Sequence, residues 1–394
     1  MSKREVVIVS AVRTGVGDFG GGLKDISPCD LGTLVIREAI GRCEVDPASV
    51  GHVYVGHVID TEPRDLYLSR VAALGAGLPQ EVAAANVNRL CGSGLQAIVS
   101  AAQAILLGDT DVAIGGGAES MSRAPYHLPS NRWGARMGDA KVIDMLVGAL
   151  SDPFDAVHMG ITAENVAARY EISREAQDEL AVQSHQRAGR AWKEGRFVSQ
   201  VVPVETKVKR KPFLFAADEH IRDGVTLEAL KSLRAAFRED GSVTAGNASG
   251  INDGASAVVL MEAAEAARRG VKPLARLVSY GHAGVEPLYM GIGPVPATRL
   301  ALKKAGLKVS DLDVIEANEA FAAQACAVAR ELDFDPEKVN PNGSGISIGH
   351  PVGATGAIIT TKAIHELQRT GGRYALVTMC IGGGQGIAAV FERV

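Results

Sequence analysis

The sequence lacks the features that would direct it to a nucleic acid, a membrane or the cell exterior. Its 394 residues carry a net charge of −4, so no excess of positive charge favours a polyanion or an anionic membrane. No apolar run long enough to span a bilayer is expected, and the first residues lack the apolar stretch of a signal peptide. The C-terminal Phe-Glu-Arg-Val is not a peroxisomal signal. We expect a cytoplasmic protein without nucleic-acid or membrane partners.

Cysteines are too few and too scattered for a disulfide framework. Their number is odd, and a reducing cytoplasm is the simplest compartment for them. The five are Cys29, Cys43, Cys91, Cys326 and Cys380. The nine histidines form neither a His-Glu-x-x-His motif nor the Cys/His spacing of a zinc site, so no metal site is predicted.

Length and patterning predict an α/β protein of two or three structural units. Hydrophobic residues make up 46% of the chain and charged residues 22%, which is typical of a globular protein. The 45 glycines cluster in a few loops. Strands are expected at residues 6–10, 53–55, 111–117, 257–261 and 274–280, and helices at residues 65–75 and 262–269.

Residues 15–20 have the Gly-x-Gly-x-x-Gly spacing of a dinucleotide-binding loop. Such a loop needs a helix that opens on its glycines. Here Gly21, Gly22 and then Pro28 follow, so we expect no helix start at this point and no nicotinamide cofactor. The next helix is expected to be capped by Asp30.

Between residues 121 and 249 the pattern changes. Residues 122–141 are rich in arginine, proline and aromatic side chains without periodicity, and residues 202–238 are polar and read as irregular. Two helices are expected between them, at residues 161–170 and, capped by Ser173, at residues 174–193. We interpret the stretch as an insertion that covers one face of the core.

The second half of the sequence repeats the first. The strand pattern that begins at Val53 recurs at Val314, and residues 113–117, Ala-Ile-Gly-Gly-Gly, recur as Cys-Ile-Gly-Gly-Gly at residues 380–384. An internal duplication, with an insertion after the first copy, explains both repeats.

Four segments place a reactive or polar side chain among glycines or at the end of an element. They are residues 89–94 (Arg-Leu-Cys-Gly-Ser-Gly), 318–321 (Asn-Glu-Ala-Phe), 342–351 (Asn-Gly-Ser-Gly-Ile-Ser-Ile-Gly-His-Pro) and 380–386 (Cys-Ile-Gly-Gly-Gly-Gln-Gly). Glycines let a ligand approach backbone N–H groups, which an oxyanion-stabilising site requires. Asn318 is expected to open a helix after a strand.

Cys91 follows an expected buried strand and precedes an amphipathic helix. The free N–H groups of a helix N-terminus favour a negative ligand, so this position predicts a reactive thiolate. For an arbitrary cysteine, a small buried core residue is the commoner interpretation. The downstream glycine-rich segments reverse that preference.

Taken together, these four segments resemble those of the thiolases, the acyl-CoA:acetyl-CoA C-acyltransferases, over essentially the full chain. The resemblance is strongest to bacterial β-ketothiolases of the type that supply polyhydroxyalkanoate synthesis. It implies two duplicated βαβαβαββ halves in a five-layered α/β/α/β/α arrangement. The implied domains are residues 1–270, with an inserted loop and tetramerisation domain at 121–249, and residues 271–394.

The resemblance also implies an activity, the reversible Claisen condensation of acetyl-CoA with an acyl-CoA to 3-ketoacyl-CoA plus CoA. In it, Cys91 matches the acylated nucleophile and His350 the histidine that activates it and donates to a thioester oxygen. Asn318 matches the residue that positions an oxyanion-hole water, and Cys380 the acid/base for the acetyl α-carbon. The N–H groups of Cys91 and Gly382 would form a second oxyanion hole.

Coenzyme A thioesters are the implied substrates, with no prosthetic group. The residues that match coenzyme A contacts are Leu150, His158, Met159, Arg222, Ser249 and Phe321, with Ile381 beside the pantetheine end. Residues 122–141 match a tetramerisation loop, which implies a homotetramer built as a dimer of dimers. The chain departs from relatives at His57 and through residues 207–211, a basic run that either meets the phosphates of coenzyme A or is solvated.

Several simpler interpretations remain open at this point. Taken singly, His350 is more commonly a turn histidine and Asn318 a helix cap, and a surface residue is an alternative interpretation of His158. A decarboxylating condensing enzyme is the rival within the same fold, but a second catalytic cysteine such as Cys380 is not expected there. A non-catalytic thiolase-like carrier would be expected to have lost a reactive group. Acyl-chain length, physiological direction and the phosphate contacts of coenzyme A are not determined by the sequence.

Overall fold

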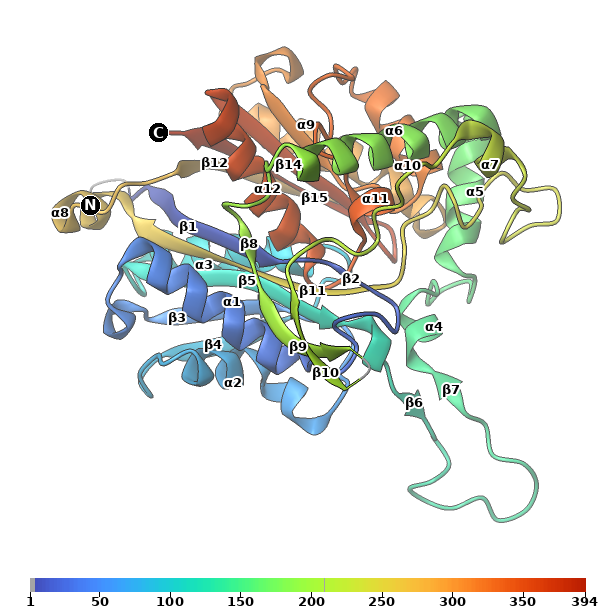
Figure 1. The fold of residues 1–394 in the computed structure, drawn as a ribbon, viewed down its shortest axis with the longest axis horizontal. Helices are drawn as coiled ribbons and strands as arrows, with labels where there is room; N and C mark the ends of the chain where they lie inside the picture. The colour runs from blue at the N-terminus through green and yellow to red at the C-terminus, as the bar shows by residue number, and fades with distance from the viewer. Residues whose placement is uncertain (1–3, 209) are drawn as a thin grey trace.

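Two similar halves, each a sheet with helices on both faces, lie against each other in the computed structural model (Figure 1). The structure describes residues 4–208 and 210–394. The strands of the first half are β1 (Val6–Thr14), β2 (Gly17–Asp18), β3 (His52–Gly56), β4 (Ala83–Val87), β5 (Val112–Ser120) and β11 (Asn252–Glu262). Those of the second half are β12 (Ala275–Gly284), β13 (Val314–Ala317), β14 (Tyr374–Ile381) and β15 (Gln385–Arg393).

Four strands follow the same order in both halves, β3-β5-β11-β1 in the first and β13-β14-β15-β12 in the second, and β4 adds a further edge strand to the first. A two-residue pairing of β1 with β12 joins the halves. Strand β3 pairs in parallel with β5, as β13 does with β14, so the repeat of Val53 at Val314 is confirmed. The glycine repeat is not equivalent. Residues 115–117 lie within β5, paired with β11, whereas residues 382–384 lie between β14 and β15.

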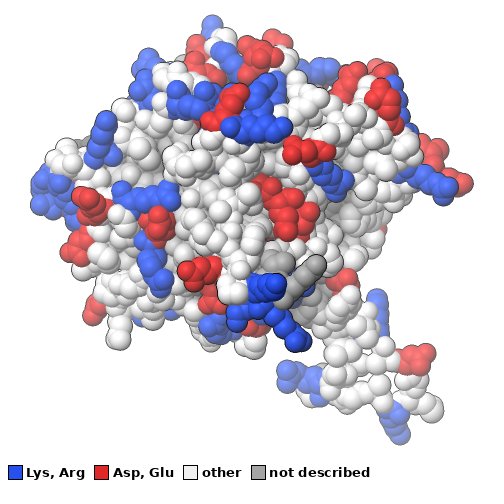
Figure 2. Space-filling view, viewed as in Figure 1, with Lys and Arg blue, Asp and Glu red and all other residues white. Residues whose placement is uncertain are grey.

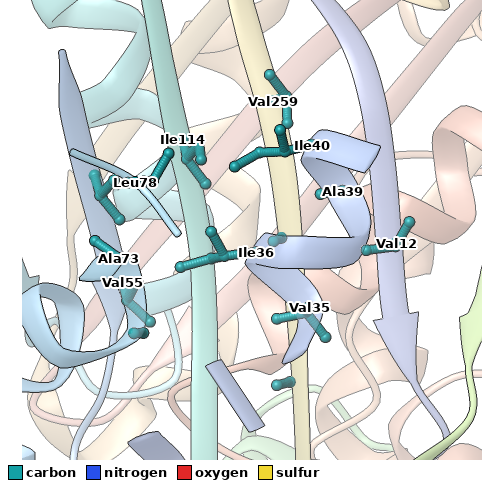
Figure 3. Close-up of a cluster of buried hydrophobic side chains, with 14 of the residues drawn as sticks. Val12, Val35, Ile36, Ala39, Ile40, Val55, Ala73, Leu78, Ile114 and Val259 are labelled. Atoms are coloured by element: carbon teal, nitrogen blue, oxygen red, sulfur yellow. The ribbon is translucent and has the colours of Figure 1, made fainter. Parts of the chain in front are cut away.

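Helices form the other three layers. Helices α1 (Pro28–Cys43) and α2 (Leu68–Gly75) cover the outer face of the first sheet, and α9 (Pro294–Ala305) and α10 (Ala322–Glu331) cover that of the second. Helices α3 (Ser93–Leu107) and α12 (Thr355–Thr370) lie between the sheets. Figure 3 shows the outer packing, where Ile36 of α1 lies over Ile114 and its neighbours. The five-layered expectation is confirmed.

Helix α3 corrects one expectation about apolar runs. The window Leu90–Leu107 is apolar and long enough to cross a membrane by composition. Within the protein, however, Leu95, Ile98 and Ile105 are fully buried between the two sheets. The apolar character of this window is that of a core helix.

The insertion contains more regular structure than the sequence suggests. Its elements are β6 (Tyr126–His127), β7 (Ile143–Asp144), α4 (Met145–Ala149), α5 (Met159–Arg169), α6 (Arg174–Lys193), β8 (Val201–Val202), β9 (Val204–Val208), β10 (Lys211–Phe215) and α7 (Leu227–Lys231). Helix α6 has the predicted bounds, and Ser173 caps it by accepting from the Ala176 N–H at 3.1 Å. The expectation of an irregular segment at 202–238 is wrong, because β9 and β10 pair as a hairpin.

The start of one helix and the burial of one strand differ from the predictions. Helix α1 begins at Pro28 with Ser27, not Asp30, as its N-cap. Proline is well tolerated at the first helical position, where its missing N–H has no partner to lose. Strand β4 is largely exposed rather than buried, because it forms the free edge of the sheet. Short helices α8 (Ala263–Arg269) and α11 (Gly345–Ile348) complete the chain.

The surface carries mixed charge. Figure 2 shows Lys and Arg interspersed with Asp and Glu over the face in view, in keeping with a net charge of −4. The arm that carries β6 and β7 projects away from the two halves (Figure 1). Its exposed side chains include Trp133, at 87%, and Met137, at 96%.

Candidate active site

The segment that carries Cys91 links edge strand β4 to helix α3. The chain leaves β4 at Val87, and α3 begins at Ser93. The Ser93 hydroxyl fixes the intervening turn, because it accepts a hydrogen bond from the Arg89 N–H at 2.9 Å and donates to the Leu90 carbonyl at 2.6 Å. Cys91 lies at the helix N-terminus, as predicted.

Leu90, next to Cys91, has a strained backbone. Its φ of 45° lies in the left-handed region, which bulky residues rarely adopt. Such strain persists only where the surrounding structure holds it, and it is common at functional sites. Both Leu90 and Cys91 line the same cavity. The strained turn therefore directs the Cys91 side chain into that cavity.

The surroundings of the Cys91 sulfur favour a neutral thiol at rest. Burial raises the pKa of the thiol, and the nearby Glu119 carboxylate adds to the rise. Hydrogen bonds from the backbone N–H groups of Gly382 and of Cys91 itself lower the pKa by less. The raised pKa runs against the expectation of a standing thiolate, because burial outweighs the two backbone N–H groups. Cys91 needs a base to become a nucleophile.

His350 is held as that base. The backbone N–H of His350 donates to Asn252 Oδ1 at 2.9 Å. The Thr355 hydroxyl donates to the Pro351 carbonyl at 2.9 Å, so it accepts from His350 Nδ1, which lies 2.7 Å away. Nε2 of the neutral ring therefore carries a lone pair. Burial lowers the pKa of His350 to about 4, so the ring is neutral at pH 7.

Asn318 lies beside that lone pair. Its Nδ2 is 3.4 Å from His350 Nε2, and its own N–H donates to the Thr378 carbonyl at 3.0 Å. The expectation that Asn318 opens a helix is wrong, because α10 begins at Ala322 with Phe321 as its N-cap. Asn318 Oδ1 is buried and has no hydrogen-bond partner among the described residues. A buried acceptor of this kind is a place for a polar ligand atom or an ordered water.

Cys380 is near the end of β14 and is fully buried. It packs against Met159, Met290 and Phe321. Burial raises the pKa of its thiol, and the neighbouring Cys91 raises it further. Cys380 is therefore a protonated thiol at rest, suited to give up a proton before it accepts one.

These groups surround one cavity of about 560 Å³. Cys91, His350 and Gly382 line it directly. Asn318 adjoins the cavity through His350, and Cys380 through Met159. The structure thus brings the predicted catalytic residues of both halves to a single place.

Six of the predicted coenzyme A contacts line the same cavity. They are Leu150, His158, Met159, Arg222, Ser249 and Phe321. His158 is not an ordinary surface residue, because its Nδ1 accepts from the Gly160 N–H at 3.0 Å and its ring stacks on Phe237 with centroids 4.8 Å apart. Burial lowers the pKa of His158. The lowered pKa favours a neutral His158 ring in the cavity wall.

The basic run at 207–211 lies elsewhere. Lys207 and Arg210 line a separate hollow with Lys24 and Glu219, and Lys209 lies outside the described residues. Ile381 does not line the main cavity but packs in the middle layer. The basic run therefore does not line the cavity around Cys91, whereas Ile381 packs beside the turn after Cys91, because an added Cβ on Gly92 would lie 2.6 Å from Ile381 Cδ1.

Sequence reasoning missed several residues of the cavity. The rejected glycine-rich segment supplies Asp18 and Phe19 to its wall, and Asp18 hydrogen-bonds to His220 beside Arg222. The hydrogen bond from His220 lowers the pKa of Asp18. The sequence did contain a signal for these residues, because a glycine-rich loop next to a strand end is suited to ligand contact. The sequence did not indicate which ligand the loop contacts.

Comparisons with known proteins agree over the whole chain. Residues 6–264 match the family described as thiolase, N-terminal domain, and residues 271–393 match thiolase, C-terminal domain. The chain is 68% identical to the beta-ketothiolase BktB of Cupriavidus necator, covering 99% of this chain and 100% of that protein. It is 51% identical to an acetyl-CoA acetyltransferase of Chromobacterium violaceum, covering 99% and 100%.

Solved structures give the same result. The Bacillus anthracis acetyl-CoA acetyltransferase superposes with a TM-score of 0.97 at 48% identity, covering 100% of this chain and 99% of that one. Human mitochondrial 3-ketoacyl-CoA thiolase in complex with CoA superposes with a TM-score of 0.96 at 44% identity, covering 99% and 98%.

Proposed function

The chain belongs to the thiolase family, and we propose that it catalyses the reversible condensation of acetyl-CoA with an acyl-CoA through an acyl group carried on Cys91. The observation that carries the proposal is the convergence of two thiols and one neutral imidazole at a single cavity, beside an amide oxygen that has no hydrogen-bond partner among the described residues. Acyl transfer to cysteine followed by carbon–carbon bond formation requires a nucleophile, a base and a group that moves the α-proton, which these thiols and the imidazole supply.

In the thiolysis direction, the first step uses Cys91 and His350. The lone pair on His350 Nε2 accepts the Cys91 proton, and the thiolate attacks the 3-keto carbon of the substrate. The backbone N–H groups of Cys91 and Gly382, which already contact the sulfur, or the Asn318 side chain with His350, are the donors for the developing oxyanion. Breakage of the C2–C3 bond then leaves an acyl group on Cys91 and the enolate of acetyl-CoA.

Cys380 balances the protons of the remaining steps. Its resting thiol gives its proton to the enolate carbon, which releases acetyl-CoA. The resulting Cys380 thiolate accepts the proton of incoming coenzyme A, whose sulfur attacks the acyl group. Cys91 leaves as a thiolate and recovers its proton from His350. The raised pKa of Cys380 suits this sequence, because the group must start protonated.

The coenzyme A thioester is proposed to lie along the wall that contains His158, Ser249 and Arg222, with its acyl end near Cys91. Beside Cys91 the wall is apolar and includes Met121, Leu150 and Val352. No prosthetic group is needed for the steps above.

A homotetramer remains part of the proposal. The arm between β6 and β7 exposes Tyr126, Trp133 and Met137, which is costly for a side chain that stays in water. The free edge of β4 is a second surface suited to another copy. A cytoplasmic location is likewise proposed, supported by five free cysteines.

The test is acylation of the intact protein. Brief incubation with acetyl-CoA and peptide mass spectrometry should place an acetyl group on Cys91. Thiolysis rates measured over 3-ketoacyl-CoA chain lengths would then define the preferred acyl group. A label on Cys380 or Cys326, with none on Cys91, contradicts the proposal. So does malonyl-CoA-dependent condensation without thiolysis of acetoacetyl-CoA, the behaviour of a decarboxylating condensing enzyme.

A further inference from the structure

His57 is buried behind the site. It follows β3 directly, and its side chain is 2% exposed. Its backbone N–H donates to the carbonyl of Val87, the last residue of β4, at 3.0 Å. Four residues later the chain reaches Cys91. The backbone of His57 therefore anchors one end of the nucleophile segment.

The four oxygen atoms that lie within 4.0 Å of the His57 ring nitrogens are all acceptors. Nδ1 lies 2.9 Å from the Ala118 carbonyl and 3.2 Å from Glu119 Oε1. Nε2 lies 3.5 Å from Asp60 Oδ1 and 4.0 Å from Asp65 Oδ2. Nδ1 donates to the Ala118 carbonyl, whereas Nε2 makes no hydrogen bond among the described residues and lies only within ion-pair distance of Asp60 and Asp65. A buried imidazole with Glu119, Asp60 and Asp65 carboxylates within 4.0 Å of its nitrogens favours the charged ring.

The pKa of His57 agrees with that geometry. Burial lowers it, but the charge and hydrogen bond of Glu119, the Ala118 carbonyl and Asp65 raise it to about 9 overall. The facing titratable groups are Glu119 on β5, and Asp60 and Asp65 on the segment after β3. Cys29 of α1 lies beyond Asp65, to which its thiol donates at 3.4 Å.

Glu119 connects His57 to the segment that carries His350. This fully buried carboxylate accepts from the Gly353 N–H at 2.9 Å, the Val58 N–H at 3.0 Å and the Ile59 N–H at 3.2 Å. Gly353 packs so closely that an added Cβ would lie 2.5 Å from Glu119 Oε2 and 2.9 Å from the His57 Cα. No side chain fits there.

Glu119 also acts on the nucleophile through its charge. It is one of the groups that raise the pKa of Cys91. An adjacent cation reduces that effect, because opposite charges at 3.2 Å offset each other's field. His57 thus influences both the position of the His350 segment and the ease with which Cys91 loses its proton.

We infer that His57 is a positioning residue that, in its protonated form, neutralises Glu119 and holds the Cys91 and His350 segments in register. This inference rests on the roles of Cys91 and His350 proposed above. Neither ring nitrogen of His57 contacts the cavity, so it acts through Glu119 and not on substrate.

The direct test is the protonation state of His57. In protein labelled with ¹⁵N-histidine, the His57 resonances are identified by their loss in His57→Gln. Both ring nitrogens should be protonated at pH 7.5 and lose a proton near pH 9. A neutral His57 ring at pH 7.5 overturns the inference, and this measurement needs no variant to be active.

The functional test is the reactivity of Cys91 toward iodoacetamide as a function of pH, together with thiolysis kinetics. His57→Gln leaves Glu119 uncompensated, so the alkylation profile should move to higher pH. kcat should fall by about 10- to 100-fold, the cost of a small misplacement, with KM changed less than about twofold. His57→Lys, which restores a cation, should recover most of the alkylation shift. Asp60→Asn, whose side chain is half exposed, is the matched control and should stay within about twofold.

The outcomes separate this inference from the proposed function. If Cys91 of the unaltered protein accepts no acetyl group, the proposed function fails. If Cys91 is acetylated normally but His57→Gln keeps the same alkylation profile and kcat, only the role of His57 is wrong.

Discussion

Thr355 Oγ1 lies 2.7 Å from His350 Nδ1 and donates its own proton to the Pro351 carbonyl. This one-way chain of hydrogen bonds decides which nitrogen of His350 is the base. All of these groups belong to one short segment, because Thr355 is the first residue of α12 and follows His350 by five positions. The base and the group that selects its tautomer are therefore fixed by the same helix start.

Replacing Thr355 should test that selection. Thr355→Val keeps the shape but removes the acceptor, so the proton of His350 redistributes between its nitrogens. We expect kcat for thiolysis to fall by about 10²-fold, in the range of a mispositioned acid/base. Thr355→Ser keeps the hydroxyl and should retain activity within a few fold. Equal activity of the valine and serine variants would mean that Thr355 does not set the tautomer.

The two cysteines should fail at different steps. Cys91→Ser lacks the nucleophile and should form no acyl-enzyme. Cys380→Ser keeps Cys91 and His350, so it should still accept an acetyl group. Deuterium exchange at the acetyl-CoA methyl and condensation should drop by about 10²- to 10⁴-fold in Cys380→Ser. Loss of acylation in both variants, measured by mass spectrometry, would refute this division of roles.

Acid should affect activity only at low pH. The folded pKa of His350 is about 4, below its unfolded value near 6.5, so the ring stays a neutral base down to about pH 4. Provided that the assembly remains folded, the acid limb of kcat/KM should lie near pH 4 and not near 6.5. An acid limb of the kcat/KM profile centred at pH 6 to 7, found with both slow and fast substrates, would contradict the lowered pKa of His350.

Stability should fall over a wider pH range than activity. His185, His282 and His350 all have pKa values lowered to about 4, mainly by burial. The unfolded chain binds protons at these residues near pH 6.5, so their contribution is fully present above that pH and is lost as the pH falls toward 4. Urea midpoints should therefore decrease from pH 7.5 to 5. A constant midpoint over that interval would show that these histidines are protonated in the folded protein.

The projecting arm should control assembly. Trp133→Ser together with Met137→Ser removes apolar surface that is exposed in the single chain. Light scattering should then report a smaller assembly than for the unaltered protein, with an unchanged fold by circular dichroism. Leu107→Ser, at an 80% exposed position at the end of α3, is the control and should leave the assembly intact. A monomer at micromolar concentration for the unaltered protein would contradict the proposed tetramer.

The sequence was most informative where chemistry and local geometry coincide. Cys91 and His350 stand among glycines at element ends, and the bounds of α6 followed from its periodicity and its Ser173 cap. Local sequence patterns did not predict the role of a residue where a contact with a distant part of the chain determines that role. Asn318 was expected to cap a helix, but its role is set by His350, 32 residues away. The protonation state of Cys91 depends on burial, which no local pattern records.

The division into two halves has a consequence for how activity arises during folding. The first half supplies Cys91, whereas Asn318, His350 and Cys380 come from the second. A chain with only its first half folded would present a protonated thiol with no base to activate it, and the second half alone would hold a base and an acid with no nucleophile. Such intermediates are chemically inert toward coenzyme A thioesters. The time at which Cys91 acylation begins during refolding therefore reports when the two halves pack against each other.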